Sequence, residues 1–150
     1  MLQSRPGPRR PAPAPAAALA LPTGLGPLHG PVRRPLVAGA FGWAERGGRP
    51  VFAPYLLLWA VPGAQWSAIA AGTVLGVHDD PGTLGLYVEV RHAAGWASQY
   101  GGCLRVLVAV GQPVAAGANL CDLAGGRAAA FGLLLDGHPV NASPYLGLGG

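Results

Sequence analysis

The chain has 150 residues, which is enough for one domain and a tail. Hydrophobic residues make up 51% of it and charged residues 11%, so disorder throughout is excluded, although 25 glycines and 16 prolines interrupt the sequence. The net charge of +4 comes from arginine alone and clusters before residue 35 without interleaved aromatic residues, so we predict no nucleic-acid partner.

The first thirty residues are rich in Pro, Ala and Gly. They predict a disordered tail at residues 1–30 that precedes a folded domain at residues 31–146. The prolines also break the apolar helix that a signal peptide needs, so the sequence gives no clear export signal.

Short apolar stretches follow the tail, and each of them predicts a strand. They lie at residues 32–41, 52–61 and 67–77, and the polar segment 42–50 predicts a loop between the first two. Residues 51–77 carry no formal charge and are long enough to span a bilayer, which makes a membrane-anchored fragment an alternative. Because Pro54, Pro62-Gly63 and Gly72 interrupt the segment, we expect no membrane span.

Residues 86–92 show the clearest strand pattern. Leu86, Val88 and Val90 alternate with polar residues, which is the period of a half-buried strand, and residues 96–100 are expected to pair with it. Further strands are predicted at 104–110, in two short pieces within 111–120, and at 128–135, where Asp136-Gly137 favours a hairpin. Seven or eight short strands predict an all-β sandwich or barrel.

The two cysteines, Cys103 and Cys121, do not form a disulfide framework. We expect them to be buried thiols, with a single disulfide as the alternative. No base is placed near either of them, so nothing predicts a nucleophilic site.

Four groups of motifs follow one another along residues 31–146. They are Phe41-Gly42 with Pro62 and Gly72-x-Val74; Tyr87-Val-Glu-Val-Arg-His92-x-x-Gly95-x-x-x-x-Tyr100; Val108-x-Val110-Gly111-Gln112-x-Val114-x-x-Gly117; and Asp136-Gly137-x-Pro139-Val140-Asn141 with Tyr145-Leu146. In this order and at this spacing they resemble the LytM/M23 metallopeptidase domain. The resemblance implies a small antiparallel β-sandwich or barrel of the LytM type.

That family holds a zinc ion with a His and an Asp four residues apart and with a His of an H-x-H strand, and the metal activates a water molecule. The other His of that strand and a His two residues after a conserved Tyr assist proton transfer. Matched residue by residue, the five positions fall on Pro54, Leu58, Gly102, Ala128 and Ala130.

None of those five side chains offers a lone pair to a metal. A shift of one residue replaces the first two by Ala53 and Leu57, which are no better. We therefore predict no catalytic residues, no metal and no cofactor. The sequence accordingly favours a degenerate homologue, or pseudoenzyme, over an enzyme.

The resemblance implies a non-catalytic binding or regulatory module of the bacterial cell envelope, with peptidoglycan or an envelope protein such as a cell-wall hydrolase as partner. His92, Trp96 and Tyr100 are the candidates for lining its groove. The family also implies a cell-envelope or extracellular location, although the missing export signal leaves the cytoplasm open.

Three alternatives remain, and a fourth is excluded. One is an M23 zinc metalloendopeptidase that cleaves peptidoglycan cross-links with a non-standard ligand set, for which His78-Asp79-Asp80 and His138 are the ligand candidates; a turn role is favoured for the former and an exposed position for the latter. Another is the membrane-anchored fragment, and a third is a decayed reading frame. A biotinyl or lipoyl carrier domain shares the Val-Gly-Gln turn but attaches its cofactor to lysine, which this chain lacks, so that function is excluded.

Overall fold

The computed structural model describes residues 28–146, so the predicted tail at residues 1–30 lies almost entirely outside the described residues. Within the described part, strands predominate and a single short helix follows the last of them. Their bounds are β1 Val37–Gly39, β2 Gly42–Arg46, β3 Arg49–Ala53, β4 Leu56–Ala60, β5 Gln65–Ser67, β6 Gly72–Asp80, β7 Gly85–Arg91, β8 Trp96–Tyr100, β9 Cys103–Val106, β10 Pro113–Val114, β11 Asn119–Leu123, β12 Arg127–Leu135, β13 His138–Val140 and α2 Ser143–Leu146.

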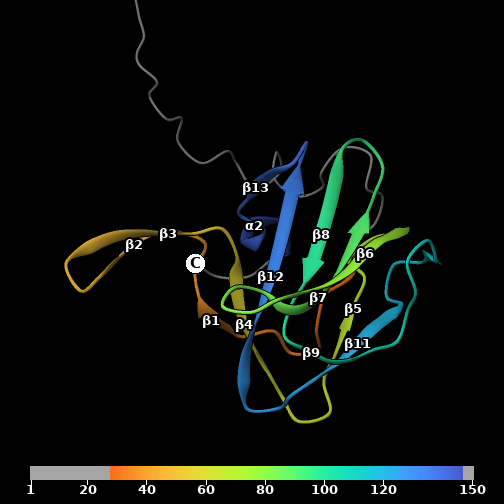
Figure 1. Ribbon diagram of the computed structural model, residues 1–150, viewed down its shortest axis with the longest axis horizontal. Helices are drawn as coiled ribbons and strands as arrows, with labels where there is room; N and C mark the ends of the chain where they lie inside the picture. Colours follow the sequence, from red (N-terminus) through yellow and green to blue (C-terminus); the bar gives the residue numbers. More distant parts are fainter. Residues whose placement is uncertain (1–27, 147–150) are drawn as a thin grey trace, which may run out of the picture.

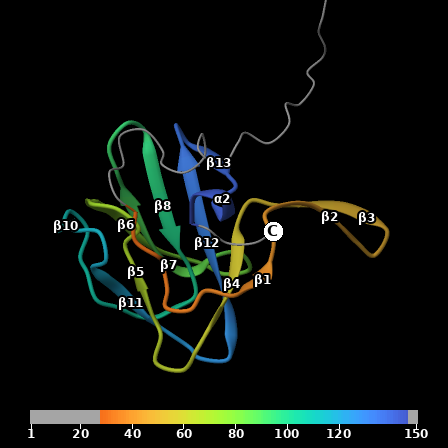
Figure 2. The same cartoon turned by 180° about the vertical axis from the view of Figure 1, so that it is seen from behind.

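The strands form three antiparallel sheets. The main sheet has the order β1-β4-β12-β8-β7-β6-β10, with β13 paired to β12 off this path. A three-stranded sheet, β5-β11-β9, lies beside it, and β2 and β3 pair only with each other. Figures 1 and 2 show the long strands β12 and β8 side by side in the middle of the main sheet. The predicted all-β antiparallel fold is confirmed.

The core contains an aromatic cluster that joins the two larger sheets. Trp66 of β5 is fully buried, and its ring centroid lies 5.8 Å from that of Tyr100 in β8 and 6.0 Å from that of Phe131 in β12. The indole Nε1–H of Trp66 donates a hydrogen bond to the carbonyl of Gly101 at 2.6 Å. The polar edge of this large ring is therefore satisfied in the interior.

The alternation of side chains gives the main sheet two distinct sides. Phe131 pairs with Tyr100, which pairs with Val88, and all three are buried on the side that faces the core. Directly opposed residues in an antiparallel sheet point to the same side, so the residues between them point away from the core. We call this second side the outer face, and its central members are Leu57, Trp59, Ala128, Ala130, Ala97, Gln99, Glu89 and Arg91.

Residues 42–50 form part of a β-hairpin and not the predicted loop. Trp43 lies opposite Phe52, and the rings of Phe41 and Trp43 are each centred 5.3 Å from that of Phe52. Gly47 and Gly48 both have positive φ, which a tight hairpin turn requires and which glycine adopts without strain. The hairpin extends sideways from the body of the domain (Figure 1).

The apolar segment before His78 also differs from the prediction of one strand at 67–77. β5 ends at Ser67, and β6 begins at Gly72, where a Cβ atom would lie 2.3 Å from the carbonyl oxygen of Arg91. Glycine is therefore required at the start of β6. The uncharged residues 51–77 are distributed over strands β3 to β6, and among the described residues we find no helix of the length and hydropathy that crossing a membrane requires.

Candidate functional site

Three of the five positions that correspond to the family's ligands and helper histidines lie on the neighbouring strands β4 and β12. Ala130 of β12 lies directly opposite Leu57 of β4, and Ala128 lies opposite Trp59, all on the outer face. Leu58 lies opposite Ala129 on the core side, and only 1% of its surface is exposed. The register thus separates Leu58 from Ala128 and Ala130 and places Leu57 with them.

The remaining two positions lie in connecting segments. Pro54 lies between β3 and β4, and Gly102 follows β8 with a positive φ of 70°. Carbon and hydrogen are the only side-chain atoms at all these positions, so the residues do not fit a zinc ion, which takes nitrogen, sulfur or oxygen ligands. Within residues 28–146, no three His, Cys, Asp or Glu side chains come together as a metal-holding group.

His92 is buried in a hydrogen-bond network below the main sheet. Its Nδ1 lies 2.8 Å from the carbonyl of Ala71 and its Nε2 lies 2.7 Å from the hydroxyl of Ser98. The hydroxyls of Ser98 and Tyr100 are hydrogen-bonded at 2.7 Å, and the Tyr100 hydroxyl accepts the backbone N–H of Ile69 at 3.0 Å. Burial lowers the pKa of His92, although the hydrogen bond to Ala71 opposes the shift. Burial is the larger of the two effects and therefore favours a neutral imidazole in a structural position.

The three residues predicted to line a groove are all on the core side. Tyr100 is fully buried, and His92 and Trp96 are each 6% exposed. Burial also raises the pKa of Tyr100 far above its usual value, so its hydroxyl stays protonated. A groove-lining role for these residues is not what the geometry favours, because the two-residue period of β8 turns Trp96, Ser98 and Tyr100 inward together.

The side chains that do reach the outer face are those that sequence reasoning passed over. Gln99 pairs with Glu89 of β7 on one side and Gly132 of β12 on the other. A Cβ at Gly132 would lie 2.9 Å from the amide oxygen of Gln99 and 3.6 Å from the ring of Tyr55, so the glycine leaves room for both. The alternation of side chains along β8 could have identified Gln99 from the sequence. If the aromatic residues Trp96 and Tyr100 point inward, residue 99 must point outward.

Tyr87 continues the polar part of the outer face along β7. Its pKa is raised, first by desolvation and then by the nearby charges of Glu89 and Asp80. Its ring centroid lies 5.3 Å from that of His78 in β6. The outer face therefore has an apolar half, Leu57 and Trp59 with the two alanines of β12, and a polar half on β7 and β8.

The alternative metal ligands are dispersed. His78, Asp79 and Asp80 extend β6 by three residues, and Asp80 accepts hydrogen bonds from Thr83 in the turn that follows. This is close to the turn role that the sequence predicted. His138 is exposed at the start of β13.

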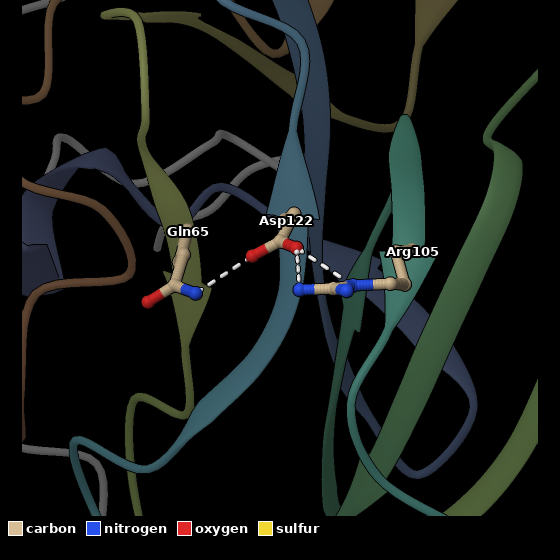
Figure 3. A network of polar contacts seen from close by, with 3 residues as sticks. All are labelled: Gln65, Arg105 and Asp122. Atoms are coloured by element: carbon tan, nitrogen blue, oxygen red, sulfur yellow. Dashed lines mark hydrogen bonds and ion pairs between the residues drawn. The ribbon is translucent and has the colours of Figure 1, made fainter.

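The three-stranded sheet carries a polar network on its surface (Figure 3). The carboxylate of Asp122 accepts the amide of Gln65 at 2.6 Å and the Nε–H of Arg105 at 3.0 Å. The hydrogen bond from Gln65 and the charge of Arg105 lower the pKa of Asp122. Arg105 is thus paired within the chain, although 74% of its side-chain surface stays exposed.

The two cysteines are joined in a disulfide, contrary to our expectation of buried thiols. Cys103 of β9 and Cys121 of β11 have Cα atoms 5.7 Å apart, which is within the range of natural disulfides. The sequence alone did not reveal this, because the spacing of two cysteines says nothing about strand pairing. The pairing of β9 with β11 brings them together.

Known proteins share this architecture. Residues 57–141 match the model of Peptidase family M23. No curated protein sequence matches the chain significantly. Solved structures are similar throughout the domain. A zinc-containing peptidase from Vibrio cholerae is 24% identical, with a TM-score of 0.64, and the alignment covers 77% of this chain and 37% of that one.

Two further structures are matched over nearly their whole length. The catalytic domain of the prophage-encoded M23 protein EnpA from Enterococcus faecalis is 23% identical with a TM-score of 0.63, over 78% of this chain and 94% of that one. A chain of the SpoIIQ–SpoIIIAH pore-forming complex is 21% identical with a TM-score of 0.68, over 81% and 92%. Since the family match covers more than half of the residues, the chain belongs to Peptidase family M23.

Proposed function

We propose that this chain is a non-catalytic LytM-type binding module of the bacterial cell envelope. One observation carries the proposal: on the outer face, Leu57, Ala128 and Ala130 present only hydrocarbon where a peptidase of this family would gather metal ligands. Without donors there is no means of activating water by a metal. The apolar and polar halves of the face still offer a surface to which an extended chain can bind.

The same register supports one choice of the residues that stand in place of the ligands. Leu57 shares the outer face with Ala130, whereas Leu58 is buried on the core side. We therefore favour the alignment that puts the family's first His and its Asp on Ala53 and Leu57, one residue before Pro54 and Leu58. Ligands on neighbouring strands must share a side of the sheet, and Leu57 meets that condition with Ala130 whereas Leu58 does not.

One observation supports the envelope as the location, and a second supports a protein partner. A structural disulfide persists in oxidising compartments and is rare in the cytosol. In addition, one similar structure belongs to a pore-forming assembly of two proteins, which is a precedent for a protein partner on this fold. We propose peptidoglycan or a cell-wall hydrolase as the partner, bound across the outer face.

The proposal can be tested with intact peptidoglycan sacculi in a co-sedimentation assay. The variant Trp59→Ala removes a side chain that is 44% exposed on the outer face, and Trp43→Ala, at 73% exposure on the hairpin, is the matched control. We expect wild type and Trp43→Ala to bind equally and Trp59→Ala to bind at least severalfold more weakly. Equal binding by both variants would contradict the outer face as the binding surface, and so would capture of neither sacculi nor a purified hydrolase by wild type.

Family membership and the similarity to a zinc-containing peptidase favour the competing function, a peptidase with another ligand set. It is tested on the same preparation by equilibrating the protein with zinc, removing free metal and measuring bound zinc and soluble peptide released from sacculi. We expect far less than one zinc per chain and no release. One tightly bound zinc together with released peptide would establish the peptidase instead.

A further inference from the structure

A small cavity opens beside the outer face, where strands β9, β11 and β12 meet. Its volume is about 220 Å³. The floor consists of Cys103, Leu123 and Ala129, which are all buried, and the rim consists of Arg127, Ala128 and Leu104, which are exposed. Gly102 also lines it. The cavity thus lies next to two positions, Gly102 and Ala128, at which the family resemblance would place histidines.

The lining has one charged group. Arg127 is the only ionisable side chain among the residues that line the cavity, since Cys103 is held in the disulfide. Within residues 28–146, Arg127 forms no ion pair; the single pair there joins Arg105 to Asp122. An exposed guanidinium beside an apolar hollow can hold a carboxylate through two parallel hydrogen bonds while the hollow receives a small apolar group.

The volume of the cavity limits the size of the group that it can bind. Pockets for drug-sized ligands have about 300–1,000 Å³, so a cavity of about 220 Å³ accommodates one small residue. We propose that this cavity binds the carboxyl-terminal residue of a peptide, with the carboxylate on Arg127 and a small side chain against Leu123 and Ala129. The inference deepens the proposed function and rests on it, because Ala128 belongs to both the outer face and the cavity rim.

A nitrogen-15 NMR titration of the full chain tests the proposal with three probes, N-acetyl-alanine, N-acetyl-alaninamide and acetate. We expect saturable shifts at the amides of Leu123, Ala124 and Ala128 with N-acetyl-alanine. The amide probe has lost the charge and is expected to bind roughly tenfold more weakly or worse. Acetate lacks the residue that fills the hollow and should also be weaker. Equal response to acetate would overturn the assignment to a peptide terminus, since any free carboxylate would then suffice.

Two variants locate the binding. Arg127→Gln should weaken N-acetyl-alanine roughly tenfold or more, and Arg49→Gln on the distant hairpin makes the same change of charge and should have no effect. Ala128→Leu narrows the rim and should weaken binding without altering charge. Unchanged binding in Arg127→Gln would refute the site. The outcome is distinguishable from failure of the proposed function, because Trp59→Ala tests the outer face and leaves the cavity lining intact.

Discussion

Leu57 and Ala130 occupy directly opposed positions on β4 and β12, and their replacement tests which alignment to the family is correct. The triple variant Ala53→His, Leu57→Asp, Ala130→His puts two donors on one side of the main sheet and a third at the end of β3. Opposed residues have Cβ atoms about 4.5–5.5 Å apart, close enough for an Asp and a His to share one ion. We expect this variant to bind about one zinc per chain, measured by metal analysis, and to unfold at a higher temperature with zinc than without.

The control for this experiment is the triple variant Pro54→His, Leu58→Asp, Ala130→His. It places the carboxylate on the core side, where an unpaired charge is costly. We expect it to bind no zinc and to be destabilised. Zinc binding by the control, and none by the first variant, would show that the alignment on Leu58 is the right one.

The buried imidazole of His92 gives the domain a predictable response to acid. Burial lowers its pKa in the folded state below the ordinary 6.5, so the unfolded chain takes up the proton first as the pH falls. The contribution of this group to stability is complete above pH 6.5 and is lost as the pH falls from there toward the lowered folded pKa. We expect the free energy of unfolding, measured in urea, to decline between about pH 7 and pH 5.

The variant His92→Gln should flatten that pH profile, because it removes the titrating group. His138→Gln changes an exposed histidine on β13 and serves as the control, with a profile like that of wild type. If His92→Gln kept the full slope, a different group would be responsible for the loss of stability.

At the scale of elements, the β2–β3 hairpin is the part with the least support from the rest of the fold. An isolated two-stranded hairpin is only marginally stable in water, and within residues 28–146 these two strands pair with no third. Within residues 36–146, we expect trypsin under limiting conditions to cut first after Arg46. The bond after Arg49 precedes Pro50 and resists the enzyme. Arg91 is the last residue of β7 and Arg127 the first of β12, and both are paired in the main sheet.

Mass spectrometry of the fragments identifies the cut, and Arg46→Gln should abolish it. The cut protein should keep the far-ultraviolet circular dichroism of a β-sheet, because the main sheet does not depend on the hairpin. Cleavage after Arg91 at a comparable rate would contradict this view of the hairpin as the least protected element.

The elements also show what the sequence can and cannot predict. Residues 86–92 and 96–100 correspond closely to the paired strands β7 and β8, because alternation and a Gly95 turn are local signals. The hairpin at 42–53 was missed because its strands are exposed on both sides, so no apolar alternation marks them. The groove candidates His92, Trp96 and Tyr100 came from the family motifs alone. The alternation of inward and outward side chains along β8 was not used. The disulfide depends on the pairing of β9 with β11, which is a long-range contact.

At the scale of the whole molecule, the disulfide between Cys103 and Cys121 connects two strands of the smaller sheet across 18 residues of sequence. A cross-link of this span restricts the unfolded chain. A disulfide that closes a loop of similar length contributes about 3 kcal/mol to the free energy of unfolding. We expect a reducing agent to lower the free energy of unfolding by about 2–4 kcal/mol, measured by urea denaturation. The double variant Cys103→Ser, Cys121→Ser should have the lower stability in both conditions and be insensitive to the reductant. Titration of two free thiols in the unfolded, unreduced protein would contradict the disulfide. It would also remove the observation that supports an oxidising envelope as the place where this domain works.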